Sequence, residues 1–180
     1  MKKPLNTFLV PASALLMLAL CQASAAGEGP QLGTPAGPQD IAAWSLTVFP
    51  DGKGLPAGKG TATAGKAVYE QQCASCHGPK GEGGSAEELA GAKHGLTESV
   101  PDKTIGNFWP HATTLFDFVR RSMPPAAPGS LNNDQLYAVC AYLLHLNGII
   151  PETAEMNATT LPQIKMPNRE GFVRVDAPRQ

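Results

Sequence analysis

The chain has 180 residues, with 14 Lys and Arg against 15 Asp and Glu, and a formal net charge of −1. This balance offers no excess of basic residues to meet phosphates, so it excludes a nucleic-acid-binding protein. Aromatic residues make up only 6% of the chain, whereas 19 Gly and 17 Pro indicate long irregular segments. We therefore expect one small domain with extensions at its ends.

The first 25 residues have the pattern of a secretory signal peptide. Lys2 and Lys3 precede a short apolar run at 14–20, and an A-x-A sequence ending at Ala25 offers a cleavage site. The run is too short to span a bilayer. Cleavage would leave 12 basic and 15 acidic residues, a net charge of −3. We expect export to the periplasm; Cys21 leaves a lipoprotein open as an alternative, although the residue before it is not small.

Residues 26–60 contain eight Gly and five Pro, which predicts a loop-rich extension. Within it, five side chains are apolar enough to dock on another surface: Ile41, Trp44, Leu46, Val48 and Phe49. Two interpretations stay open here, a simple linker and a strap that lies across the domain.

The first helix of the domain is expected to begin after Thr61 or Thr63, either of which can cap it, and to run to Cys73. Gly65 precedes Tyr69 by four residues, so the two share a face. A glycine inside a helix costs about 1 kcal/mol relative to alanine. We therefore expect Gly65 to allow another helix to approach closely.

The sequence Cys73-Ala74-Ser75-Cys76-His77 follows. A Cys-x-x-Cys-His run is an attachment site for c-type haem. Its two thiols can form thioethers with the vinyl groups of one porphyrin, and His77 can serve as the proximal iron ligand. In the flexible turn that comes next, we expect the carbonyl of Pro79 to accept a hydrogen bond from the other ring nitrogen of His77.

After the haem motif, Ala86–Leu89 is a short helical candidate. Pro110 suits the first turn of a longer helix that continues through Arg120. Trp109 and either Arg120 or Arg121 could meet the haem propionates. The alternative is that the two arginines form a solvated helix end, where their charge favours the helix dipole.

Met123 is the candidate distal iron ligand. A thioether sulfur suits low-spin haem iron, and ligation by His and Met raises the reduction potential. Pro124 and the prolines after it stiffen the loop and would hold the sulfur in place. Met166, His111 and His145 are the alternative ligands.

The last helix is expected after Asn132, with Gln135 completing a capping box. An apolar stripe supports it and consists of Leu136, Val139, Cys140, Leu143 and Leu146. Asn147-Gly148 ends the helix. We expect Tyr142 to pack over Gly65, Cys140 to be a small buried core residue, and residues 150–180 to form a tail that wraps over the surface.

Four motifs together resemble class I cytochromes c: Gly65-x-x-x-Tyr69, Cys73-x-x-Cys76-His77-Gly78, Met123-Pro124 and Val139-x-Ala141-Tyr142-Leu143. The match covers about residues 61–148. The resemblance implies an all-α fold around one covalent haem, with Cys73 and Cys76 as attachment points and His77 and Met123 as axial ligands. The expected organisation is a signal peptide at 1–25, a Gly/Pro-rich extension at 26–60, the cytochrome c domain at 61–149 and a C-terminal tail at 150–180.

A narrower resemblance is to the cytochrome subunits of sulfite and sulfur dehydrogenases. The segments that carry it are Trp44 through Gly58, Lys103 through Pro110, Ala112 through Val119, Tyr142 through Gly148, and Met166 through Phe172. It implies a protein that accepts electrons from a molybdenum-containing partner and passes them to another cytochrome c or an oxidase. His111, where an aromatic residue such as tyrosine is expected, and Cys140 depart from the pattern.

Other functions remain open at this point. The chain could be a general periplasmic cytochrome c that serves another dehydrogenase or a terminal oxidase, or a haem sensor or enzyme with an open distal position. A structural zinc site would need four ligands, and no second Cys/His pair stands at a suitable spacing. A thiol oxidoreductase would place its Cys-x-x-Cys near a βαβ pattern, which the sequence lacks.

Overall fold

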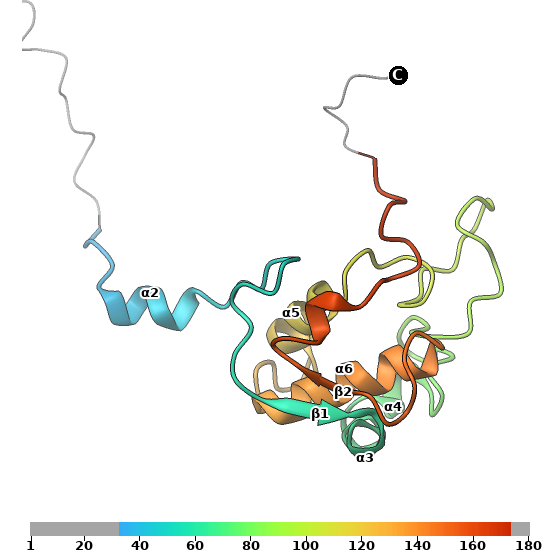
Figure 1. The fold of residues 1–180 in the computed structure, drawn as a ribbon, viewed down its shortest axis with the longest axis horizontal. Helices are drawn as coiled ribbons and strands as arrows, with labels where there is room; N and C mark the ends of the chain where they lie inside the picture. The colour runs from blue at the N-terminus through green and yellow to red at the C-terminus, as the bar shows by residue number, and fades with distance from the viewer. Residues whose placement is uncertain (1–32, 174–180) are drawn as a thin grey trace, which may run out of the picture. The chain divides into compact units, whose positions relative to one another are not determined.

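Residues 33–173 are described in the computed structural model of the chain (Figure 1). The predicted signal peptide and Cys21 lie outside the described residues. The chain divides into two units after Ile41, within the short helix α2 (Pro38–Trp44). Between residues 33 and 173, no helix has the length and apolar character that a membrane crossing requires.

Two crossing helices, α3 (Ala62–Gln72) and α6 (Asn133–Leu146), form the centre of the fold. They meet at Gly65, where a Cβ atom would overlap the carbonyl oxygen of Ala138 and lie 2.9 Å from the Cβ of Tyr142. The rings of Tyr69 and Tyr142 are 5.2 Å apart beside this crossing. The predicted contact between Gly65 and Tyr142 is confirmed, and the backbone of α6 at Ala138 makes the tightest part of it.

Both helices begin with the side-chain caps that the sequence predicts. The Thr61 hydroxyl accepts a hydrogen bond from the Ala64 N–H at 3.3 Å. The Asn132 side chain accepts from the Gln135 N–H at 2.9 Å, and the Gln135 side chain accepts from the Asn132 N–H at 3.0 Å. These bonds satisfy backbone donors that the first helical turn leaves without a partner.

The third long helix, α5 (Ala112–Ser122), begins later than Pro110 suggests. His111 is the N-cap and Pro110 lies one residue before it, outside the helix, so the first-turn position predicted for Pro110 is wrong. The His111 side chain makes no capping hydrogen bond.

A small sheet joins the two ends of the domain. Strand β1 (Lys59–Thr61) pairs with β2 (Glu155–Asn157) in antiparallel register, with Gly60 opposite Met156. The long helices confirm the predicted all-α fold. The two strands were not predicted because three residues are too few to show an alternating apolar pattern. The C-terminal segment then forms a short 3₁₀ helix, η2 (Leu161–Gln163), whose Leu161 is completely buried.

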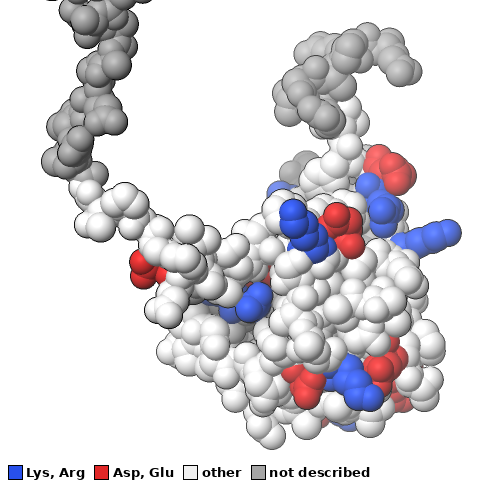
Figure 2. Space-filling model, turned by 60° about the vertical axis from the view of Figure 1, so that its left-hand side comes forward, with Lys and Arg blue, Asp and Glu red and all other residues white. Residues whose placement is uncertain are grey.

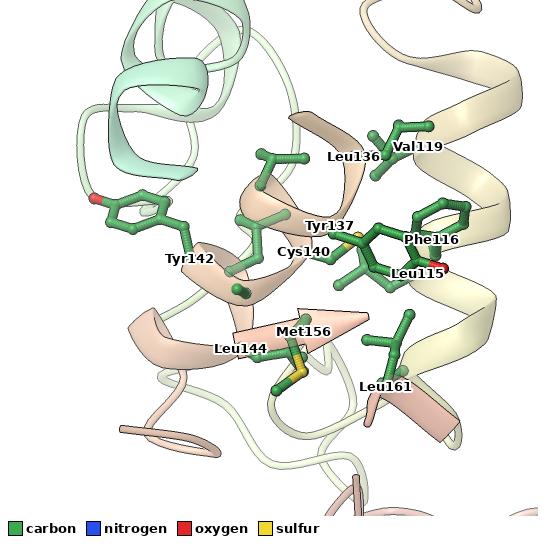
Figure 3. Packing of buried hydrophobic residues seen from close by; sticks show 14 of the residues in the cluster. Leu115, Phe116, Val119, Leu136, Tyr137, Cys140, Tyr142, Leu144, Met156 and Leu161 are labelled. Carbon is green, nitrogen blue, oxygen red and sulfur yellow. The ribbon is translucent and has the colours of Figure 1, made fainter. Parts of the chain in front are cut away.

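The core lies between α5, α6 and this C-terminal segment (Figure 3). Phe116 of α5 and Tyr137 of α6 pack with their ring centroids 4.7 Å apart. Cys140 is fully buried among them, as predicted. Burial raises the pKa of its thiol, so Cys140 is a neutral apolar core residue.

Candidate haem-binding site

The haem motif lies where α3 ends. The Cys73 N–H still bonds to the carbonyl of Tyr69 at 2.9 Å, and the chain then makes one further turn, α4 (Ala74–His77). The His77 N–H closes this turn on the Cys73 carbonyl at 3.0 Å. A single helical turn thereby brings both thiols and the imidazole to the wall of one cavity of about 360 Å³.

The wall of this cavity is apolar apart from a few groups. It contains Met123, the predicted distal ligand, together with Cys73, Cys76 and His77. No Lys, Arg, Asp or Glu contributes to it, and the remaining residues are Gln72, Ser85, Ala86, Leu89, Ile105, Trp109, Leu115, Phe118, Val119, Pro124, Pro125, Val139 and Leu143. Two thiols, an imidazole and a thioether in an apolar cavity form a donor set that fits a covalently bound haem.

His77 is oriented by a backbone group that was not predicted from the sequence. Its Nδ1 lies 2.7 Å from the carbonyl oxygen of Glu87. The expected acceptor, the carbonyl of Pro79, is therefore wrong. The Gly83 N–H bonds back to the His77 carbonyl at 2.8 Å and the Ala86 N–H bonds to the Cys76 carbonyl at 3.0 Å, so the loop returns residues 86–89 to the haem motif.

This return also explains why the helix predicted at Ala86–Leu89 does not form. The N–H groups of Leu89 and Ala90 both bond to the carbonyl of Gly81, at 2.7 and 2.9 Å. Since these donors are used across the loop, they are not available for a helical turn. The Glu87 carbonyl is left free to accept from His77, which fixes the ring orientation and leaves Nε2 for a metal.

A second hydrogen bond fixes the backbone next to His77. The hydroxyl of the fully buried Tyr69 donates to the carbonyl of Gly78 at 2.7 Å. Burial, with a smaller contribution from Cys73, raises the pKa of Tyr69 to about 12. The phenol therefore stays protonated and keeps donating at neutral pH.

Cys73 is half-buried and Cys76 is exposed. Burial, and to a smaller extent Cys76, raises the pKa of the Cys73 thiol to about 11. As a free side chain it is consequently a neutral thiol at neutral pH, which suits the apolar wall it joins.

The alternative iron ligands lie elsewhere. Met166 is buried but belongs to a separate hollow formed by residues 162–171. The Nδ1 of His145 is 3.2 Å from the Ile150 carbonyl oxygen, and neither His145 nor His111 lines the cavity. The Nδ1 of His111 is buried without a hydrogen-bond partner within the described part of the chain.

Of the residues predicted to meet the propionates, Trp109 lines the cavity and Arg120 does not. The Nη1 atom of Arg120 is 3.5 Å from the carbonyl oxygen of Leu46, so its contact with a propionate stays a prediction. Phe118, which packs edge-to-face on Trp109 with centroids 5.8 Å apart, also lines the cavity. Phe118 was not predicted as a site residue, although its spacing from Leu115 places both on one face of α5.

Within residues 33–173, no group of three or more His, Cys, Asp and Glu side chains is placed to hold a metal ion. The zinc-binding alternative thus gains no further ligands from the described structure. On the face shown in Figure 2, charged side chains form small groups of mixed sign and leave a broad uncharged area.

The helices, the attachment motif and the apolar cavity define a cytochrome c, and a family model described as cytochrome c matches residues 62–147. The chain belongs to this family. Among solved structures it is similar to the sulfane dehydrogenase SoxCD from Paracoccus pantotrophus, with 41% sequence identity and a TM-score of 0.75. That match covers 82% of this chain and 73% of the other. Comparison with curated proteins gave no match.

These findings confirm the predicted class I cytochrome c fold and the resemblance to sulfur dehydrogenases. As a member of the family, the chain carries covalently attached haem c and is an electron-carrier cytochrome. When bound, the haem supplies one-electron exchange between Fe(III) and Fe(II).

Proposed function

We propose that this protein is the periplasmic electron acceptor of a molybdenum-containing dehydrogenase that oxidises sulfite or a related sulfur species. One haem is attached through Cys73 and Cys76, with His77 and Met123 as axial ligands. The electron then leaves to another cytochrome c or an oxidase. The observation that carries the proposal is the similarity to the sulfane dehydrogenase SoxCD at 41% identity over 82% of this chain.

The ligation is supported by the cavity wall, which holds His77 and Met123 together. Nδ1 of His77 is occupied by the Glu87 carbonyl at 2.7 Å, so Nε2 is the free nitrogen. Four side chains were considered as distal ligand: Met123, Met166, His111 and His145. Of these, Met123 lines the cavity. With both axial positions filled, the iron binds no substrate and the protein works by electron transfer alone.

Met123→Ala is expected to abolish the sulfur-to-iron charge-transfer band of the oxidised protein and to lower the reduction potential, because a thioether favours Fe(II). Met166→Ala is the matched control and should change neither, since Met166 lies in a separate hollow. The two measurements are the absorption spectrum and a redox titration. The reverse result for the two variants would make Met166 the ligand.

The contact with the electron donor is expected at the mouth of the cavity. Phe118 lines the cavity and keeps 44% of its surface exposed, so it is available to a partner. Neighbouring wall residues are uncharged, which suits an apolar contact that brings two cofactors together without long side chains between them.

Export is supported by the signal pattern ending at Ala25, which precedes the described residues. The apolar run at 14–20 is too short to span a membrane. We expect the mature protein to begin at Ala26, and N-terminal sequencing of protein recovered from the periplasm would test this.

Stopped-flow mixing tests the partner. The oxidised cytochrome is mixed with a sulfite or sulfane dehydrogenase and its sulfur substrate, and reduction is followed in the haem spectrum. Phe118→Ala should slow the second-order rate, whereas Val100→Ala, which removes another exposed apolar side chain away from the cavity wall, should not. If such dehydrogenases fail to reduce the parent protein, the proposed partner is wrong and the function remains that of a general electron carrier.

A further inference from the structure

The segment before the haem domain is fastened to the outer side of α5. The Val48 N–H donates to Oδ1 of Asp117 at 2.9 Å, and Nε of Arg121 donates to Oδ2 of the same carboxylate at 2.9 Å. Nη2 of Arg121 donates in turn to the Thr47 hydroxyl at 3.0 Å. Thr47, Val48, Asp117 and Arg121 thus form a closed set of contacts, which we call the clamp.

The segment that the clamp holds is itself anchored. Val48 is 7% exposed and belongs to the core. The Phe49 N–H bonds to the Lys53 carbonyl at 2.9 Å, closing a turn. In this turn Gly54 has φ +91°, and any Cβ there would overlap the Thr47 carbonyl oxygen. Residues 47–54 are therefore fixed to the domain as a strap. Of the apolar side chains expected to dock, Val48 is buried, whereas Ile41, Trp44 and Phe49 are 57%, 85% and 47% exposed.

The opposite side of α5 faces the haem cavity. Leu115, Phe118 and Val119 line it, and Met123 follows directly after the last helical residue. The Met123 N–H bonds to the Val119 carbonyl at 3.0 Å, so the helix end sets where the Met123 loop begins. Because Asp117 and Arg121 lie in the last turns of α5, the clamp fixes this helix end against the strap.

We propose that Asp117 is a positioning residue that keeps Met123 on the haem iron through the end of α5. The inference rests on the proposed ligation by Met123. The loop that carries Met123 would have to move for the sulfur to leave the iron. The clamp holds the end of α5 from which this loop begins, and so makes that movement less favourable. The Asp117 and Arg121 side chains are 23% and 36% exposed, so solvent screens their attraction only in part.

Imidazole is the probe, because it binds ferric haem where Met123 has left the iron. Its apparent affinity therefore rises in proportion to the fraction of molecules with the distal position open. For Asp117→Ala in the holoprotein, we expect an apparent dissociation constant about three- to tenfold lower than in the parent, the change that loss of a partly exposed charged hydrogen bond produces. The sulfur-to-iron band should also weaken.

Two further variants calibrate this result. Asp117→Asn can still accept from Val48 but loses the charge that faces Arg121, so its imidazole affinity should lie between those of the parent and Asp117→Ala. Lys59→Ala removes an ion pair of the same type, 3.2 Å from Glu155 on the small sheet, and should leave imidazole binding unchanged. If Asp117→Ala lowers the melting temperature but binds imidazole like the parent, the residue has only a structural role and the inference fails.

The Met123→Ala background separates this inference from the proposed ligation. There the distal position no longer needs to open, so adding Asp117→Ala should leave the imidazole affinity unchanged. An effect of the same size in that background would show that Asp117 does not act through Met123 and would overturn the inference. If Met123→Ala itself retains the sulfur-to-iron band, the ligation proposal fails instead.

Discussion

Two glycines are placed where a single residue of the last helix meets the rest of the domain. A Cβ on Gly60 or on Gly65 would overlap backbone atoms of Ala138. Neither glycine has a positive φ, so the requirement is one of space. Strand β1 and helix α3 can therefore both lie close to the backbone of α6 at Ala138.

Gly65→Ala is expected to destabilise the protein by about 1–3 kcal/mol, because the added methyl group overpacks a rigid backbone contact. The preference of helices for alanine over glycine, about 1 kcal/mol, works against this loss. Urea unfolding measures the difference. Gly95→Ala is the matched control, since its Cβ would make an ordinary contact at 3.6 Å and should change little. A higher midpoint for Gly65→Ala would mean that the helices do not meet there, because the helix preference for alanine would then act unopposed.

Tyr69→Phe removes the hydroxyl that bonds to the Gly78 carbonyl at 2.7 Å. The lost hydrogen bond should cost about 0.5–1.5 kcal/mol in the free energy of unfolding at neutral pH. Tyr142→Phe is a suitable comparison, because its hydroxyl takes part in no hydrogen bond described for this structure. Equal unfolding midpoints for the two variants would contradict the role given to Tyr69.

The same tyrosine predicts a dependence on alkaline pH. Folding raises its pKa from 10.0 to about 12, chiefly through burial. Its contribution to stability is complete below pH 10 and is lost as the pH rises toward 12, since the unfolded chain releases the proton first. The stability of the parent should therefore fall over this range, and that of Tyr69→Phe should fall less steeply. Parallel curves from unfolding at a series of pH values would show that Tyr69 does not contribute.

At the scale of elements, the C-terminal segment is part of the domain. Met156, Leu161 and Met166 are each at most 3% exposed, although the segment shows no helical period. Gly52 of the strap's turn packs against Pro162, where a Cβ would overlap the proline ring. The part of the expected tail around β2 and η2 thus packs on α5 and α6 and belongs to the core.

Leu161→Ala should cost about 2–5 kcal/mol, the loss that truncating a fully buried leucine produces. Leu96→Ala serves as the control because Leu96 is 37% exposed. Thermal unfolding of the holoprotein would compare them. Similar melting temperatures for both variants would mean that Leu161 of η2 does not contribute to the stability of the core.

The elements that the sequence predicts well are those with local signals. Thr61 and Asn132 each cap a helix with their own side chain, and Gly148 ends the last helix at φ +68°. Strands β1 and β2 could not be predicted because 93 residues separate Thr61 from Glu155 at one end of the ladder and their pairing depends on tertiary packing. The loop around Glu87 was not predicted because its shape comes from irregular hydrogen bonds to the carbonyls of Gly81 and Cys76, which no sequence period indicates.

At the scale of the whole molecule, the side chains expected to bind haem lie around one cavity. The attachment motif, Met123 and Trp109 all reach a single cavity with an uncharged wall. The ligand types were predictable because a Cys-x-x-Cys-His motif followed by a Met-Pro pair is typical of covalent haem attachment and axial ligation. The contacts that orient these ligands could not be predicted from the sequence. They are the hydrogen bond between His77 and the Glu87 carbonyl and the contacts of Asp117 near the end of α5.

The most direct test of the central claim is mass spectrometry of tryptic peptides from the chain made with haem-maturation machinery, after denaturation and alkylation. We predict that the peptide spanning residues 67–80 carries the mass of one haem and no alkyl label on Cys73 or Cys76, while Cys140 is alkylated. Acid–acetone extraction beforehand should not remove the haem. A peptide with both cysteines alkylated and no haem mass would contradict the account of this chain as a haem c electron carrier.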